Sequence, residues 1–366
     1  MMRQNYKKNR EAEISAHSFF CLFQKNEYFC PIFFAIKTIL IMKRVLFITL
    51  LLIGLAPFAH AKRFSAKCET GQVLQYEIQE DNASVEVVNF FFECGRKQLK
   101  IPSSVTYKEK IYTVTSIGCA AFSYGKMTEV YIPNTILYVK AFAFSTCERL
   151  RTVHFSEGLL RIGPTAFWQC SRLESITIPN SVISIGWSAF DGCKSLSSIS
   201  FPEHLEAIGD YAFCECSNLI SVEIPASVTY LGHSAFYRCE NLLSVDIQAK
   251  IRSIPFMAFS NCTRLTSVCL PSTLDTIERS AFSSCDSLVT IVLPSSLEYI
   301  ESYAFAFCDN LSSIHIPEHV YFIDEEAFAY CPKLTSFTVA PENPFYYHRK
   351  SCDAILENAA KPLKRK

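Results

Sequence analysis

Cysteine and histidine are the residues of this sequence with the most evident chemical potential, since thiols form disulfides and both residue types bind zinc. The chain has 17 Cys and 8 His, but no CxxC pair. His154 and His315 occupy equivalent positions seven repeats apart, too far to share an ion. We therefore expect neither a metal site nor a cofactor.

Nine of the cysteines recur at a fixed position, three residues after a phenylalanine: 147, 170, 193, 216, 239, 262, 285, 308 and 331. Side chains stacked in one column point the same way, whereas a disulfide needs them to point toward each other. These residues are expected to be buried free thiols that fill space in the core. Cys68 and Cys94 flank a separate segment, where a disulfide is one of two open alternatives.

The sequence shows no arrangement typical of a catalyst. It lacks a nucleophile elbow, a phosphate-binding glycine loop and a convincing Ser-His-Asp set, and its carboxylates are scattered over variable positions. We therefore expect that the protein is not an enzyme. The 35 basic and 35 acidic residues balance, which removes the usual electrostatic reason to expect a nucleic-acid partner or a polybasic membrane contact.

The elements that must position any site come from a repeat. An Ala-Phe pair recurs ten times, first after 22 residues and then every 23, at Phe122, 144, 167, 190, 213, 236, 259, 282, 305 and 328. An aliphatic residue precedes each Phe by five positions, and a Leu-x-[Ser/Thr]-aliphatic-x-aliphatic stretch, usually ended by Pro, follows it. Such a period predicts an α/β solenoid of about ten units, each with one short parallel strand and one helical or 3₁₀ turn carrying the Phe.

These residues resemble a known family. The string "SVTYLGHSAFYRC" at 227–239, repeated in many columns over about 114–340, is similar to the 23-residue leucine-rich repeat of the BspA-like surface-protein family. The resemblance implies a leucine-rich-repeat array and adhesion to host or matrix proteins, or to other cells. Ser156, Gln248 and Ala340 depart from the pattern where most repeats have the strand-ending Pro.

The segments outside the repeats divide the chain further. Residues 42–61 have the charge, the apolar run and the Ala59-x-Ala61 end of an export signal, which predicts a mature chain from Lys62 and makes 1–41 an upstream extension. The alternative is one long membrane anchor. Residues 62–113 alternate like strands and predict a β-rich N-terminal cap, 114–340 form the repeat array, and 341–366 are either a C-terminal cap or a shortened tail.

Two sets of residues are candidates for partner binding. The variable outward position of each predicted strand forms a column with an acidic centre: His154, Thr177, Ser200, Glu223, Asp246 and His315. A second strip follows the Phe: Trp168, Tyr237 and Arg238. The alternative for the column is a plain solvated face, and the strip could equally pack between neighbouring turns.

We interpret the chain as a secreted or cell-surface protein that reaches the membrane only through its export signal. On this hypothesis its strand face binds a host or matrix protein, or another surface macromolecule. The alternative is a glycan-binding or envelope-organising protein, in which Trp168 or Tyr237 would stack on sugars.

Overall fold

The computed structural model describes residues 62–69, 71–88, 97–343 and 355–360. Residues 61–366 form one compact unit with a continuous core. The predicted upstream extension, the predicted export signal at 42–61, Cys94 and much of 341–366 lie outside the described residues. In the described part of the chain, no helix is long and apolar enough to cross a membrane.

Five strands at the N-terminal end of the described chain form one sheet: β1 (Arg63–Lys67), β2 (Val73–Ile78), β3 (Ser84–Val87), β5 (Ser104–Tyr107) and β6 (Lys110–Ile117). β1 pairs antiparallel with β2, and β2 with β3, while β6 pairs parallel with β3 and antiparallel with β5. The ring of Phe64 stacks on Tyr107 at 4.3 Å between centroids. β6 then pairs with the first solenoid strand, so this segment covers the end of the core.

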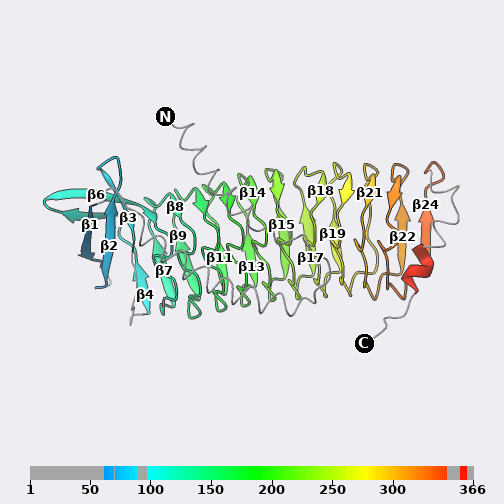
Figure 1. Cartoon of the computed structure of the whole chain (residues 1–366), viewed down its shortest axis with the longest axis horizontal. Helices are drawn as coiled ribbons and strands as arrows, with labels where there is room; N and C mark the ends of the chain where they lie inside the picture. Colours follow the sequence, from blue (N-terminus) through cyan, green and yellow to red (C-terminus); the bar gives the residue numbers. More distant parts are fainter. Residues whose placement is uncertain (1–61, 70, 89–96, 344–354, 361–366) are drawn as a thin grey trace, which may run out of the picture. The chain divides into compact units, whose positions relative to one another are not determined.

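Most repeats contribute two strands, and like strands of neighbouring turns pair in parallel, which gives two strand rows with interruptions (Figure 1). The first row contains β8 (Tyr138–Val139), β10 (Arg161–Ile162), β12 (Ser184–Ile185), β14 (Ala207–Ile208), β16 (Tyr230–Leu231), β18 (Ser253–Ile254), β20 (Thr276–Ile277), β21 (Tyr299–Ile300) and β23 (Phe322–Ile323). The second row contains β4 (Gln98–Lys100), β7 (Glu129–Ile132), β9 (Thr152–Phe155), β11 (Ser175–Thr177), β13 (Ser198–Ser200), β15 (Ser221–Ile224), β17 (Ser244–Ile247), β19 (Ser267–Cys269), β22 (Ser313–Ile316) and β24 (Ser336–Val339). The predicted solenoid of about ten 23-residue turns is confirmed. The prediction of one strand per turn was wrong.

The predicted helical or 3₁₀ turn was also wrong. Around Phe213, Tyr211 and Glu215 have φ of 56° and 55°, and the corresponding residues of most other turns also have positive φ. Left-handed residues two positions before and after the Phe interrupt a helix before it can form. The Phe213 N–H therefore donates to the carbonyl of Ala235 in the next turn, at 2.8 Å, and the same bond recurs between neighbouring turns. Among the described residues, only 355–359 are helical, so the fold is a β-solenoid rather than α/β.

The core lies inside the turns and repeats with them. The ten Phe side chains are fully buried, and neighbouring rings stack at 5.2 to 5.5 Å. The nine column cysteines are buried free thiols, as predicted. Each also donates its S–H to the Phe carbonyl of the preceding turn, as Cys216 does to Phe190 at 3.3 Å. The column thus needs a small side chain that is apolar and still a weak donor.

The last turn is contacted by the short helical segment. Ile355 and Ala359 are buried, and the Tyr330 N–H donates to the Asn358 carbonyl at 3.2 Å. In the other turns, the backbone N–H two residues after the core Phe donates to a backbone carbonyl of the turn that follows, as Phe307 does to Ala329. The helical segment therefore provides the acceptor that a further turn would have supplied.

Candidate binding site

The variable column lies on the outer face of the second strand row. His154, Thr177, Ser200, Glu223 and His315 are exposed, and Asp246 is half-buried, whereas the aliphatic neighbours of most of these residues point inward. The outer face follows from strand alternation, because successive side chains point to opposite sides.

Pairing between strands divides this column into three groups. Thr177 pairs with Ser200, Glu223 with Asp246, and His315 with Thr338, but the ladder is interrupted between β13 and β15 and between β19 and β22. The residues of the column therefore do not form one continuous site. The first group, together with His154, lines a hollow.

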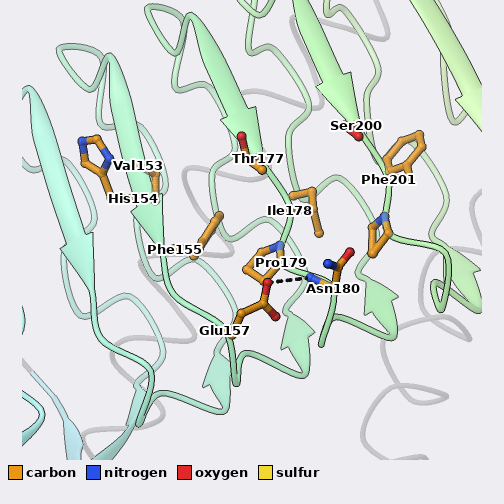
Figure 2. Close-up of a pocket in the computed structure, with 11 residues that line it drawn as sticks. Val153, His154, Phe155, Glu157, Thr177, Ile178, Pro179, Asn180, Ser200 and Phe201 are labelled. Atoms are coloured by element: carbon orange, nitrogen blue, oxygen red, sulfur yellow. Dashed lines mark hydrogen bonds between the residues drawn. The ribbon is translucent and has the colours of Figure 1, made fainter.

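This hollow has a volume of about 300 Å³ and lies over β9, β11 and β13. Figure 2 shows His154, Thr177 and Ser200 on the three strands, with apolar side chains closer to the strand ends. The remaining lining residues are Val153, Phe155, Glu157, Ile178, Pro179, Asn180, Phe201 and Pro202. The site thus combines an apolar lining with hydroxyl, imidazole, amide and carboxylate groups.

Two phenylalanines limit the hollow on either side of a smaller residue. Phe155 packs edge-on against the core ring of Phe167 at 5.9 Å, and Phe201 packs against Phe213 at 5.4 Å. Ile178 occupies the equivalent position in the turn between them. We attribute the hollow to this shorter side chain, which fills less space than the rings in the turns before and after it.

The polar groups at the hollow are held by neighbouring residues. The Glu157 carboxylate accepts the backbone N–H of Asn180 at 3.2 Å (Figure 2) and that of Ser181 at 3.2 Å. The His154 ring stacks on Tyr131 at 4.4 Å, and its Nε2 lies 2.8 Å from the Glu129 carboxylate. Hydrogen bonds from His154 and then Tyr131 lower the pKa of Glu129. The imidazole is therefore fixed at one side of the hollow.

The predicted acidic centre is a bridged pair. The Gln248 amide donates to Glu223 at 2.7 Å and to Asp246 at 3.3 Å, so it shields two carboxylates that face each other across paired strands. Further along, His315 Nδ1 lies 2.9 Å from the Thr338 hydroxyl.

The second predicted strip lies on the turn segment that carries the Phe, and none of its residues lines the hollow. Trp168, Tyr237 and Arg238 are half-buried. The Trp168 indole N–H donates to Asp191 in the next turn at 3.2 Å, while Arg238 lies over the Tyr237 ring and 3.6 Å from Glu215. These contacts join neighbouring turns.

Several residues of the site were not singled out in the sequence. Phe155 and Phe201 occupy a strand position that faces the core. In the sequence they differ from the other turns only in having an aromatic ring where most turns have a branched aliphatic residue. Gln248 was noted only as a departure from the strand-ending proline, and Glu157 is a loop carboxylate with no distinctive signal. In the described part of the chain, no group of three or more His, Cys, Asp or Glu is arranged to hold a metal ion.

Comparison with known proteins decides the family. The model of the BspA type leucine-rich repeat region matches residues 115–243 and 229–348, with six copies. The chain belongs to the BspA-type leucine-rich repeat family. The expected resemblance is therefore confirmed, and this BspA-type array spans the whole of the strand rows after β6.

Solved structures of other repeat proteins resemble this BspA-type chain. The pneumococcal vaccine antigen PcpA is 24% identical over 76% of this chain and 82% of that one, with a TM-score of 0.55. A leucine-rich cell surface protein from Faecalibacterium prausnitzii is 22% identical over 82% of this chain and 99% of that one, with a TM-score of 0.42. A leucine-rich repeat protein from Bacteroides ovatus is 27% identical over 79% of this chain and 97% of that one, with a TM-score of 0.36. PcpA supports the fold assignment alone, and no curated protein matches.

Proposed function

We propose that this chain is an exported, surface-displayed binding protein, similar to an adhesin, whose second strand row holds a host or matrix protein. The observation that carries the proposal is the hollow over β9, β11 and β13, where three residues of the variable column meet an apolar lining. The export pattern at 42–61 and membership of the BspA-type family support display outside the cell.

The composition of the hollow favours a protein side chain as the group that enters it. Phe155, Ile178 and Phe201 provide apolar surface, and His154, Asn180 and Ser200 provide hydrogen-bonding groups around it. Interfaces between proteins commonly place one apolar anchor in such a depression and surround it with polar contacts. A volume of about 300 Å³ is sufficient for an aromatic or branched aliphatic anchor.

The proposal is tested with the predicted mature chain, residues 62–366, on an array that carries matrix proteins and glycans. Thr177→Arg places a long side chain in the hollow from an exposed strand position, so it blocks binding without disturbing the core. The matched control is Thr338→Arg, which makes the same change at the same column position seven turns away. We expect Thr177→Arg to weaken a protein interaction at least about tenfold and the control to leave it unchanged.

Two results would contradict this function. Equal binding by Thr177→Arg and Thr338→Arg would place the contact outside the hollow. A glycan interaction that is lost in Trp168→Ala and kept in Thr177→Arg would favour the sugar-binding alternative and the turn segment.

A further inference from the structure

An aromatic cluster lies on the outer face of the first strand row, away from the residues that line the hollow. Tyr299, Tyr321 and Phe322 expose 37%, 49% and 45% of their surface. We name these three residues the aromatic face. Large exposed aromatic side chains in one cluster are unusual on a protein that has no partner there, because they leave apolar surface in water.

The aromatic face is formed by two neighbouring turns. Tyr299 in β21 pairs directly with Phe322 in β23, and their ring centroids are 6.4 Å apart. Tyr321 lies edge-on to Tyr299 at 4.8 Å. In the turns of β12, β14, β18 and β20, the residue equivalent to Phe322 is Ser, Ala or Thr. The cluster is therefore not required by the repeat.

Hydrogen bonds hold the rings in place. The Tyr321 hydroxyl donates to the Glu298 carboxylate at 2.8 Å and lies 2.6 Å from the Tyr299 hydroxyl. Rings that are already positioned lose less conformational freedom when a ligand binds. Glu298 also places a negative charge at the edge of the aromatic face.

The segment of sequence that carries the aromatic face is acidic. Residues 280–332 contain eight Asp or Glu and no Lys or Arg, although the whole chain is balanced. In the described part of the chain, none of these eight carboxylates forms an ion pair with Lys or Arg. One turn before Glu298, by contrast, Asp275 is paired with Arg252 at 2.7 Å. Between Arg279 and Lys333, therefore, no Lys or Arg balances a carboxylate as Arg252 balances Asp275.

From these observations we propose that the aromatic face binds a basic polypeptide segment of another protein, with Lys or Arg side chains over the rings and beside Glu298. Aromatic rings attract cations through their faces, and Arg stacks on them well. Uncompensated carboxylates attract the same cations over a longer range. Uncompensated carboxylates disfavour an anionic partner, so charge and ring chemistry both favour a cationic ligand.

The test measures binding of a fluorescent alternating Arg-Gly peptide to residues 62–366 by anisotropy, with a Glu-Gly peptide as the comparison ligand. We expect Phe322→Ser and Glu298→Gln each to weaken Arg-Gly binding about fivefold or more, and added salt to weaken it further. Tyr321→Phe keeps the ring and should retain most of the affinity. The matched control is Tyr230→Ser, at the equivalent strand position of β16, where the exposed tyrosine donates to Asp210.

The proposal is overturned if Tyr230→Ser weakens binding as much as Phe322→Ser, or if the Glu-Gly peptide binds equally well. It is also overturned if a chain ending at Ala360 binds the Arg-Gly peptide far more tightly than the longer chain. In that case the protein's own basic end, Lys361 to Lys366, would be the occupant. Thr177→Arg should leave peptide binding unchanged, which separates this site from the hollow. Circular dichroism melts confirm that each variant is folded.

Discussion

The Asp191→Asn substitution is expected to change the pH dependence of stability. Asp191 follows the core residue Phe190, and its carboxylate interacts with Trp168, Cys214 and Ser188. The residue as a whole keeps some exposed surface, but its carboxyl group is enclosed. Burial, and then the charge of Glu215, raise its pKa from 3.8 to about 7.

The sign follows from the protons that each state binds. Between about pH 4 and pH 7, Asp191 is protonated in the folded protein and ionised in the unfolded chain, so stability falls as the pH rises. A difference of about three pKa units corresponds to roughly 4 kcal/mol, lost between pH 4 and a pH above 7. An asparagine side chain at this position does not ionise, so the variant would not lose this stability as the pH rises. The variant should therefore gain stability relative to the wild type as the pH increases.

Urea unfolding of residues 62–366 at a series of pH values from 4 to 8.5 measures this effect directly. We expect the difference in unfolding free energy, variant minus wild type, to rise by about 2 to 4 kcal/mol over that range. Glu203→Gln, which alters an exposed carboxylate, should give a flat difference. A flat difference for Asp191→Asn as well would refute the reasoning, because it would mean that the carboxyl is hydrated or paired in the folded protein.

Two further predictions concern thiols and backbone conformation. Cys269 is exposed on β19, so Cys269→Ser should remove about one fast-reacting equivalent in a thiol assay of the native protein. Cys262→Ser should not, because burial raises the pKa of the Cys262 thiol, and equal losses would contradict this. Thr146 has φ of 59°, so Thr146→Gly should leave stability unchanged or raise it by up to about 1 kcal/mol. Ser198→Gly in the extended strand β13 should lower it by about 0.5 to 1 kcal/mol, and the reverse order in thermal melts would be inconsistent with left-handed strain.

The period and the buried columns could be predicted from the sequence because burial imposes the same residue type in every turn. Phe213 stacks on the equivalent rings of both neighbouring turns, and Cys216 donates to the Phe190 carbonyl of the preceding turn, so both positions are repeated with the turns. The first strand row could not be predicted in the same way. A strand of two residues, such as Ser184–Ile185, is too short to display alternation. The left-handed positions were missed because Tyr211 and Glu215 are not the residues that usually mark positive φ.

The candidate site was predicted only in part. Alternation placed Thr177 and Ser200 on the outer face, but it could not reveal which outward residues share a depression. The hollow depends on inward residues, because the rings of Phe155 and Phe201 flank the shorter Ile178. The aromatic face was missed because it belongs to the strand row that alternation did not predict.

The solenoid can carry two independent surfaces because its turns interact mainly with their neighbours. At the turn around Phe213, β14 pairs with β16, β15 pairs with β17, and the turn segment bonds to the next turn through its backbone. Outward side chains such as Thr177 and Phe322 make none of these backbone bonds with their side-chain atoms. Substitutions there should therefore change the surface of one or two turns while the core stays in place. The same independence explains how the turns of β21 and β23 can present aromatic rings beside Glu298, while β9 to β13 present an apolar hollow edged by polar groups, without any change in the fold.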